Sequence, residues 1–349
     1  MTMLADRIDA VIGVDTHTDT HTAAACDPRG GVLAEITVDS DEAGFGQLLD
    51  FVLKHAPGPR LAWAVEGTGS YGAGLAEALR EVDQEVIEAP RPRRERGQDK
   101  NDAADAIKMA RAVLGLARHA QPRRGQVRET MRLITLSRSA DVKARTRLTN
   151  QVKAVLVTAP SALRDRFRGQ GTAAQLTLAR RLRGPRDGDL RTQTCVQMLT
   201  KLAAQISALD KSITAAERQL DDLTGTFAQP LRDLYGVGPV SAAQLLITWS
   251  HPGRFRSEAA FAAIAGTSPL EASSGRTVRH RLNRGGDRQL NAALHRVLLT
   301  RRRHNHDETR AYIDRRTAEG RTSREIERCL KRALARRLHR LLETMPALP

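Results

Sequence analysis

Apolar and polar residues alternate along the first third of the chain in segments short enough to form strands. Apolar runs at residues 10–15, 22–26 and 32–38 predict three consecutive strands joined by turns. Residues 44–55 then place apolar side chains at helical spacing, and a Pro-Gly-Pro sequence ends that pattern. We therefore expect this part of the chain to begin with a three-strand meander and a helix.

A second alternation of strand and helix follows the first helix. The apolar run 61–65 predicts a strand that ends at Glu66, a Gly-rich turn leads into a helix over 73–82, and residues 85–89 predict a fifth strand. A meander followed by helix, strand, helix and strand is the order of the ribonuclease-H-like α/β fold. We therefore expect residues 1–120 to form a ribonuclease-H-like (RuvC-like) domain.

The rest of the chain has an all-α pattern. Asn101 predicts the N-cap of a helix over 102–117. Heptad-like repeats at 127–157 and 195–223 predict an antiparallel helical pair or coiled coil, which would act as a spacer or associate with a second copy. Two further regions are therefore expected: a helical coiled-coil or oligomerisation region at 121–228, and a mostly helical C-terminal domain at 229–349.

Charge is distributed unevenly along the chain. The net charge is +16, yet residues 1–100 hold 10 Lys and Arg against 18 Asp and Glu, which leaves 46 against 22 for the remainder. Only 8 of the 56 basic residues are Lys, a bias that genomic base composition also produces, but such a bias does not by itself separate the charges. The separation favours a basic body that binds nucleic acid and an acidic domain that binds metal ions. Because aromatic residues make up only 3%, we expect contacts to the phosphate backbone rather than extensive base stacking.

Composition disfavours several other classes of protein. No apolar run approaches the roughly 20 residues that span a bilayer, and the first ten residues lack the pattern of a signal peptide. Three cysteines, Cys26, Cys195 and Cys329, are too far apart for a zinc site and odd in number for a disulfide framework. We expect no membrane partner and a cytoplasmic, nucleoid-associated protein.

Four acidic residues stand where the predicted elements bring them together: Asp15, Glu66, Asp102 and Asp105. The first two end strands, and the last two are spaced to share one helical face. Each alone has an ordinary interpretation as a cap or a solvated acid, but four clustered carboxylates repel one another unless hard cations neutralise them. Oxygen-only ligation predicts two Mg²⁺ ions, with Mn²⁺ as a substitute, which is the chemistry of phosphodiester transfer. The neighbouring His17, Asp19 and Asp99 are expected to be solvated or to support the ligands.

The C-terminal region offers two further candidate sites. Gly236 and Gly238 allow a tight hairpin before Pro239, whose amides would bind a phosphate as in helix-hairpin-helix motifs, although a plain helical turn fits equally well. Ser274 lies in a Gly-flanked segment and is either a nucleophile toward a phosphodiester or an ordinary turn residue. No His/Asp pattern of a hydrolase triad accompanies it. The guanidinium groups that would hold the DNA are those of Arg276, Arg279, Arg281, Arg284 and Arg288.

The motifs V-I-G-V-D, A-V-E-G-T-G, K-N-D-A-A-D-A, L-x-G-V-G-P and G-T-S-P-L-E-A-S-S-G-R occur in this order over almost the whole chain. This set resembles the IS110 family of insertion-sequence transposases, relatives of the pilin-gene invertases. The resemblance implies a RuvC-like domain with a D-E-D-D metal site, a coiled-coil middle and a C-terminal transposase domain. By position the metal ligands are the four acids named above, and the catalytic serine is Ser274, or Ser273 if the register differs by one.

The resemblance also implies partners. It suggests a covalent phosphoserine link to double-stranded DNA at the element ends and target, assembly as dimers or tetramers, and guidance by a noncoding bridge RNA. The segment after Gly275 is richer in Arg than the family pattern, so the individual DNA contacts stay open.

Three alternatives remain at this point. A Holliday-junction-type endonuclease would use the four acids with water and would not need Ser274. A non-catalytic, Arg-rich DNA-binding protein would carry the acids as surface residues. An actin-like phosphotransferase would need further Gly-rich phosphate loops, and no convincing ones are present.

Overall fold

A computed structural model describes residues 2–90, 101–184, 189–271, 275, 280–281 and 285–349. The chain divides into two compact units, Met1–Arg124 and Gly125–Pro349. Among the described residues, none of the helices combines the length and the apolar character needed to cross a membrane.

The first unit is built on a five-stranded sheet with the order β3-β2-β1-β4-β5. β1 pairs antiparallel with β2, which pairs antiparallel with β3, whereas β1, β4 and β5 run parallel to one another. All five predicted strands are present, each within two residues of its expected bounds. They are β1 (Ala10–Thr16), β2 (Thr20–Cys26), β3 (Val32–Asp39), β4 (Leu61–Val65) and β5 (Glu85–Glu88).

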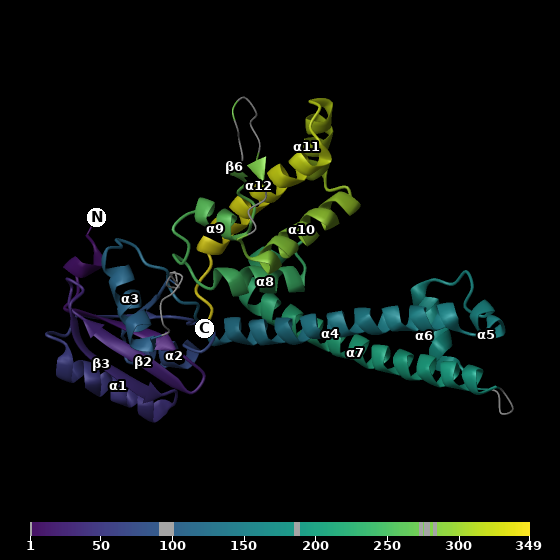
Figure 1. Ribbon diagram of the computed structural model, residues 1–349. Helices are drawn as coiled ribbons and strands as arrows, with labels where there is room; N and C mark the ends of the chain where they lie inside the picture. The colour runs from purple at the N-terminus through teal and green to yellow at the C-terminus, as the bar shows by residue number, and fades with distance from the viewer. Residues whose placement is uncertain (1, 91–100, 185–188, 272–274, 276–279, 282–284) are drawn as a thin grey trace. The chain divides into compact units, whose positions relative to one another are not determined.

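Helices cover both faces of this sheet. On one face α3 (Asp102–Leu114) packs on β1, β2 and β4, and the short 3₁₀ helix η1 (Leu4–Asp6) lies beside it. On the other face, α1 (Glu42–His55) and α2 (Ala73–Glu81) contribute to a core around the buried Trp63. Figure 1 shows α3 and α1 on opposite sides of the strands. The predicted N-cap is confirmed, because the Asn101 side chain accepts a hydrogen bond from the amide of Ala104 at 3.2 Å.

Gly13 lets α3 approach the sheet closely. A Cβ atom at this position would lie 1.9 Å from the carbonyl oxygen of Ala106 and 2.7 Å from the amide nitrogen of Ala110. Only a glycine therefore fits between the centre of β1 and the backbone of α3. This contact fixes the position of the helix whose first turn carries Asp102 and Asp105.

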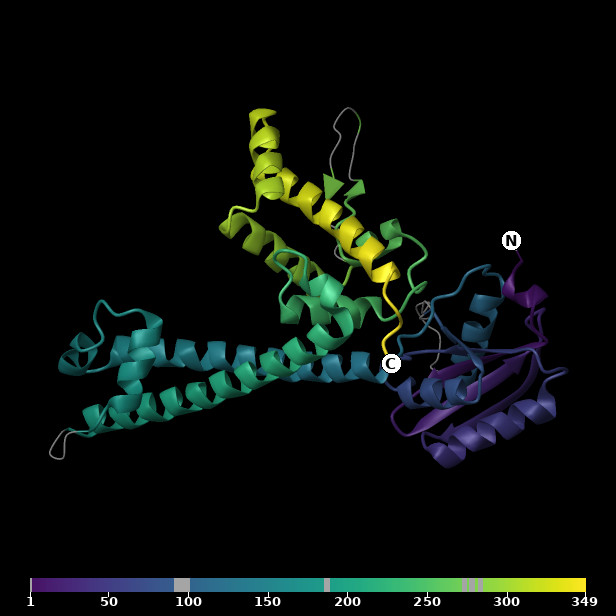
Figure 2. The same cartoon turned by 180° about the vertical axis from the view of Figure 1, so that it is seen from behind.

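The second unit begins with a long two-helix arm. α4 (Gln126–Thr158) lies beside α7 (Leu190–Arg232). Ion pairs join Arg138 to Glu217 and Arg145 to Asp210. Residue numbers rise along α4 as they fall along α7, so the pair is antiparallel, as Figure 2 shows.

The segment at the far end of the arm had no predicted structure, and it forms two short helices. These are α5 (Ser161–Asp165) and α6 (Thr172–Arg181). They bury Leu163, Phe167 and Leu176 against apolar residues of α4 and α7 in a separate cluster. The tip of the arm therefore has its own hydrophobic core.

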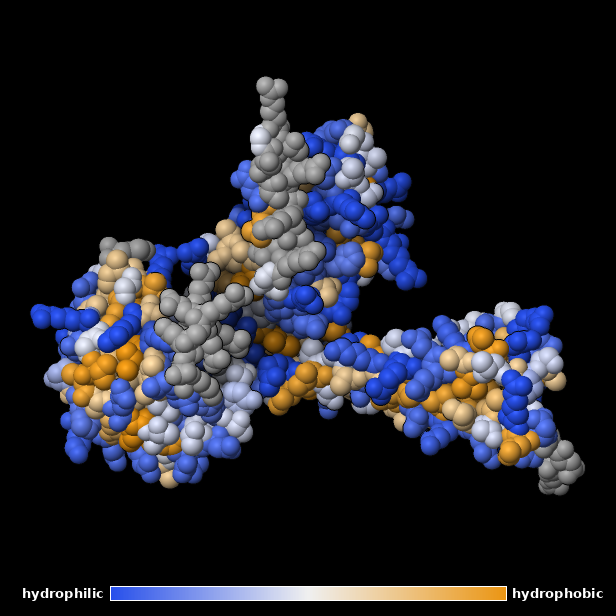
Figure 3. Space-filling view, in the orientation of Figure 1, coloured by the Kyte–Doolittle hydropathy of each residue, from blue (hydrophilic) through white to orange (hydrophobic). Residues whose placement is uncertain are grey.

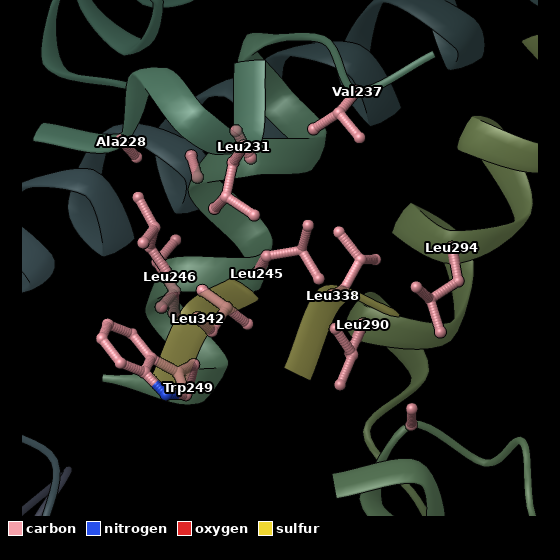
Figure 4. Packing of buried hydrophobic residues seen from close by; sticks show 14 of the residues in the cluster. Ala228, Leu231, Val237, Leu245, Leu246, Trp249, Leu290, Leu294, Leu338 and Leu342 are labelled. Atoms are coloured by element: carbon pink, nitrogen blue, oxygen red, sulfur yellow. The ribbon is translucent and has the colours of Figure 1, made fainter. Parts of the chain in front are cut away.

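The rest of the second unit packs around one buried helix, α8 (Pro239–Trp249), in which every residue from Ser241 onward is buried. Figure 4 shows Leu245, Leu246 and Trp249 of this helix among Leu290, Leu294 and Leu338. A helix that is buried on all sides forms the centre of a core rather than a surface, and the buried Gln244 and Thr248 of α8 are hydrogen-bonded to each other at 3.2 Å. The other elements are α9 (Glu258–Ile264), β6 (Leu270–Glu271), β7 (His280–Arg281), α10 (Arg288–Arg303), α11 (Asp307–Ala318) and α12 (Ser323–Glu343).

Candidate metal centre

Two of the predicted acids lie at the carboxyl ends of neighbouring parallel strands. Val14 of β1 is level with Val65 of β4, so Asp15 and Glu66 occupy the next equivalent positions. Along β1, Val11 and Gly13 face α3, and the two-residue period of a strand directs Asp15 to the same face. The backbone at Glu66 is anchored to β1, because its amide donates to Val14 and its carbonyl accepts from the Thr16 hydroxyl at 3.1 Å.

The other two acids come from the first turn of α3, which packs on that face. The Asp105 side chain is 13% exposed and pairs with Lys108 at 3.2 Å, whereas the Asp102 side chain is 39% exposed. Their spacing of three residues puts both carboxylates on one side of the helix. The structure therefore places Asp102 beside Asp15, together with His17, while Glu66 lies at the matching position of β4 and Asp105 lies in the first turn of α3.

Burial and neighbouring charges determine the direction of the pKa shift of Asp15. Burial raises the pKa of the Asp15 carboxyl, and the neighbouring positive charge of His17 opposes this rise. The negative charges of Asp102, Glu66 and Asp105 raise the pKa further. A buried carboxylate that interacts with three others has unfavourable energy in the absence of a cation.

His17 is the residue of the site that sequence reasoning underrated. It was expected to be solvated or to support the ligands, but its Nε2 atom lies 3.4 Å from both Asp15 Oδ2 and Asp102 Oδ1. This nitrogen is buried and makes no hydrogen bond. A signal was present in the sequence, because His17 follows Asp15 by two residues and strand alternation puts both on one face. Asp19, in contrast, is exposed, and Asp99 lies outside the described residues.

The residues present fit a divalent cation. One ligand atom from each of Asp15, His17 and Asp102 lies within 4.8 Å of the others. Two ligands on one ion, each about 2.1 Å from it, lie roughly 3 to 4 Å apart, which matches the separations around His17. The surplus of negative charge and the buried nitrogen without a hydrogen bond both favour a bound ion.

The hairpin predicted in the second unit is a tight turn between α7 and α8. Gly236 has a φ of +87°, a conformation that favours glycine, and Gly238 caps the helix ahead of Pro239. Two arginines hold the carbonyls of this turn: Arg301 donates to Tyr235 at 2.9 Å and Arg232 donates to Val237 at 3.2 Å. The geometry is compatible with phosphate binding and with a purely structural turn, so that role stays a prediction.

Most of the predicted serine segment cannot be located. Ser273, Ser274, Arg276, Arg279 and Arg284 lie outside the described residues. The backbone of Arg281 pairs with Leu270 in the ladder of β6 and β7, so this ladder brackets the serines in the chain. Arg288 is exposed in the first turn of α10.

Two family models of known transposases match separate regions of the chain. A family model described as a transposase of the DEDD, IS110 type matches residues 12–159, and a second, described as the IS116/IS110/IS902 transposase family, matches residues 228–314. The first match includes the four acids, and the second includes the turn at Gly236 and Gly238.

Two curated relatives span most of the chain. A 44.8 kDa protein of insertion element IS116 from Streptomyces clavuligerus is 26% identical, and the alignment covers 78% of this chain and 79% of the relative. A protein of the IS117 mini-circle from Streptomyces coelicolor is 25% identical, with 78% and 80% covered. Together with the two family models, these relatives place the chain in the IS110/IS116/IS902 family of insertion-sequence transposases.

Proposed function

We propose that this transposase is a metal-dependent DNA recombinase that cuts and rejoins DNA through a covalent serine intermediate. The single observation that carries the proposal is that the buried Asp15 and Asp102 of α3 place carboxylate oxygens, with a nitrogen of His17, within 4.8 Å of one another. The strand order of the first unit, in which an antiparallel meander precedes two parallel strands, supports a ribonuclease-H-like fold for this domain. Acids at the strand ends of such a sheet are placed to work at a phosphodiester.

The first unit would hold the cations and orient the reacting phosphate. Asp15, Glu66, Asp102 and Asp105 would bind two Mg²⁺ ions, and Mn²⁺ would substitute for them. When bound, the ions lower the barrier by neutralising charge that develops on the phosphate oxygens. The chain itself keeps the acids in position, because Gly13 allows α3 to pack closely on β1 and the Thr16 hydroxyl donates a hydrogen bond to the carbonyl of Glu66.

The second unit would supply the nucleophile and the grip on DNA. In the proposed step the Ser274 oxygen attacks phosphorus, the bond to the leaving strand breaks, and that strand departs with a free hydroxyl. A second strand end then attacks the phosphoserine and releases the serine. Arg276, Arg279, Arg281, Arg284 and Arg288 would neutralise phosphates, and the turn at Gly236 and Gly238 would contact the backbone.

Assembly and guidance complete the proposal. Large apolar side chains are exposed along α4, among them Leu133 and Leu136, and Figure 3 shows apolar surface along the arm. Self-association through this surface would give the dimer or tetramer that joining two DNA ends requires. A noncoding RNA encoded beside the gene is the proposed guide, and the Arg-rich composition is compatible with it.

The test is a search for a protein–DNA adduct. The full chain is incubated with Mg²⁺, element-end DNA and any adjacent transcript, and denaturing gels are inspected for a covalent band. Ser274→Ala is expected to abolish the band, and the matched Ser273→Ala change to preserve it. A band lost with Ser273→Ala alone would move the nucleophile by one residue. If neither change affects the band, the serine mechanism is wrong.

A hydrolytic junction endonuclease is the second candidate, because all four acids belong to the first unit and need nothing from Ser274. That enzyme would cleave DNA without forming an adduct, and Ser274→Ala would leave cleavage unchanged. Asp102→Asn separates both enzymes from a non-catalytic DNA-binding protein, whose behaviour it would not alter.

A further inference from the structure

Two histidines, His17 and His21, lie close to the turn between β1 and β2, and they differ in burial and in hydrogen bonding. β1 and β2 are joined by a short turn in which the His17 amide donates to the Thr20 carbonyl at 3.0 Å. The His21 ring is fully buried, lies parallel to the Phe45 ring, and uses both nitrogens, toward the Thr20 carbonyl and the Ser40 hydroxyl. His21 is thus a structural residue with its hydrogen-bonding capacity used within the protein.

His17 differs in each of these respects. Strand alternation puts it on the α3 face with Asp15, and its Nε2 atom lies between Asp15 and Asp102, 3.4 Å from a carboxylate oxygen of each. This nitrogen is buried without a hydrogen bond, although 35% of the side chain is exposed. Buried polar atoms normally make hydrogen bonds, so a nitrogen that lies between two carboxylates without a hydrogen bond to either calls for an explanation.

We propose that His17 is a nitrogen ligand of the ion held by Asp15 and Asp102. This inference rests on the proposed function, because it assumes that the four acids form a metal site, and it changes the chemistry of that site. An all-oxygen site favours Mg²⁺, whereas an imidazole ligand raises the relative affinity for first-row transition ions. The centre is thus a mixed nitrogen and oxygen site, whose affinity for Mn²⁺ relative to Mg²⁺ is higher than that of the four carboxylates alone.

The competing explanation is that His17 is only a counter-ion. A protonated imidazole between two carboxylates would offset their repulsion and would have to leave when a cation arrives. The two roles predict opposite results for His17→Gln. Removing a ligand weakens Mn²⁺ binding, whereas removing a positive charge strengthens it.

Electron paramagnetic resonance measures the binding of Mn²⁺ to the full chain, and it shows whether His17→Gln weakens or strengthens that binding. For His17→Gln we expect Mn²⁺ affinity to fall about 10-fold or more, as for lost ligands and their supporting groups, and Mg²⁺ affinity, measured by competition, to change much less. The control is His55→Gln, which removes an exposed histidine from α1 and should leave both affinities unchanged. Unchanged or tighter Mn²⁺ binding by His17→Gln overturns the inference.

Pulsed measurements on the same samples detect the bond directly and also work on the unmodified chain. Bound Mn²⁺ should show a coupling to a histidine nitrogen, which changes on ¹⁵N-histidine labelling and disappears in His17→Gln. Bound Mn²⁺ without that coupling overturns the role of His17 and leaves the carboxylate site intact. Failure of the unmodified chain to bind Mn²⁺ or Mg²⁺ overturns the proposed function itself.

Discussion

The strands that carry the acid site of the first unit and the strand that precedes Ser274 in the second unit differ in burial. Asp15 lies near the end of β1 and Glu66 directly follows β4, and because almost all residues of these strands are buried, the pleat and register of the sheet determine where the two side chains point. β6, the strand that leads toward Ser274, has two residues, both exposed. Functional side chains on a buried strand can thus be located from the sequence pattern, whereas the residues that follow an exposed two-residue strand can be proposed only by their type.

The largest expected effect comes from removing the central charge of the acid site. Asp15→Asn should reduce divalent-ion affinity by about 10-fold or more and DNA cleavage by about 100-fold or more. In metal-free buffer the same change should maintain or raise the free energy of unfolding, because folding raises the pKa of this carboxyl and its ionised form opposes folding. Calorimetric titration and chemical denaturation measure the two quantities. A variant with full ion affinity would show that Asp15 is not a ligand.

The next effect tests whether packing positions the acids. Gly13→Ala would force a Cβ atom against the backbone of α3, so we expect a loss of at least about 1–3 kcal/mol in stability together with weaker ion binding. The matched control is Gly46→Ala in α1, where a Cβ atom meets nothing within 4 Å. Helix propensity predicts that the control stabilises the protein by about 0.5–1 kcal/mol. Equal ion affinity in both variants would contradict the positioning role of Gly13.

A smaller effect concerns assembly through the arm of the second unit. Leu133 and Leu136 are 52% and 60% exposed and lie three residues apart on α4. Changing both to Glu should shift the mass measured by light scattering toward the monomer while leaving ion binding intact. Leu53→Glu in α1, at an 80% exposed position, is the control and should leave the mass unchanged. An unaltered mass in the double variant would show that the protein does not self-associate through this surface.

The smallest effect is a pH dependence of stability. Burial lowers the pKa of His21 below its usual 6.5, and the charge of His17 lowers it further; burial also lowers the pKa of His119. As pH falls below about 6.5, the unfolded chain binds protons that the folded unit excludes, so the free energy of unfolding decreases. His21→Gln should flatten this dependence, as measured by urea unfolding at pH 8 and pH 5.5. If the free energy of unfolding of this variant depends on pH as steeply as that of the unmodified chain, groups other than His21 cause the dependence.

Local pattern was sufficient to predict the strands, the long helices and the N-cap at Asn101, and it placed Asp15 and Asp102 in the elements that bring them together. It did not identify the close packing at Gly13, because that contact depends on which face of the sheet α3 covers. The closeness of His17 to Asp15 and Asp102 was underrated because His17 lies just past the end of β1, where spacing from Asp15 indicates a face but not a contact. The helices α5 and α6 were not predicted because their few apolar residues, such as Leu163 and Leu176, gain stability only against the arm.

Anomalous X-ray diffraction from crystals grown with Mn²⁺ would show directly whether the four acids bind divalent ions. We expect a strong anomalous peak between the carboxylates of Asp15 and Asp102, with the oxygens of Glu66 and Asp105 directed toward the same cation cluster. A map with no peak among these four side chains, at Mn²⁺ concentrations that support DNA cleavage, would contradict it.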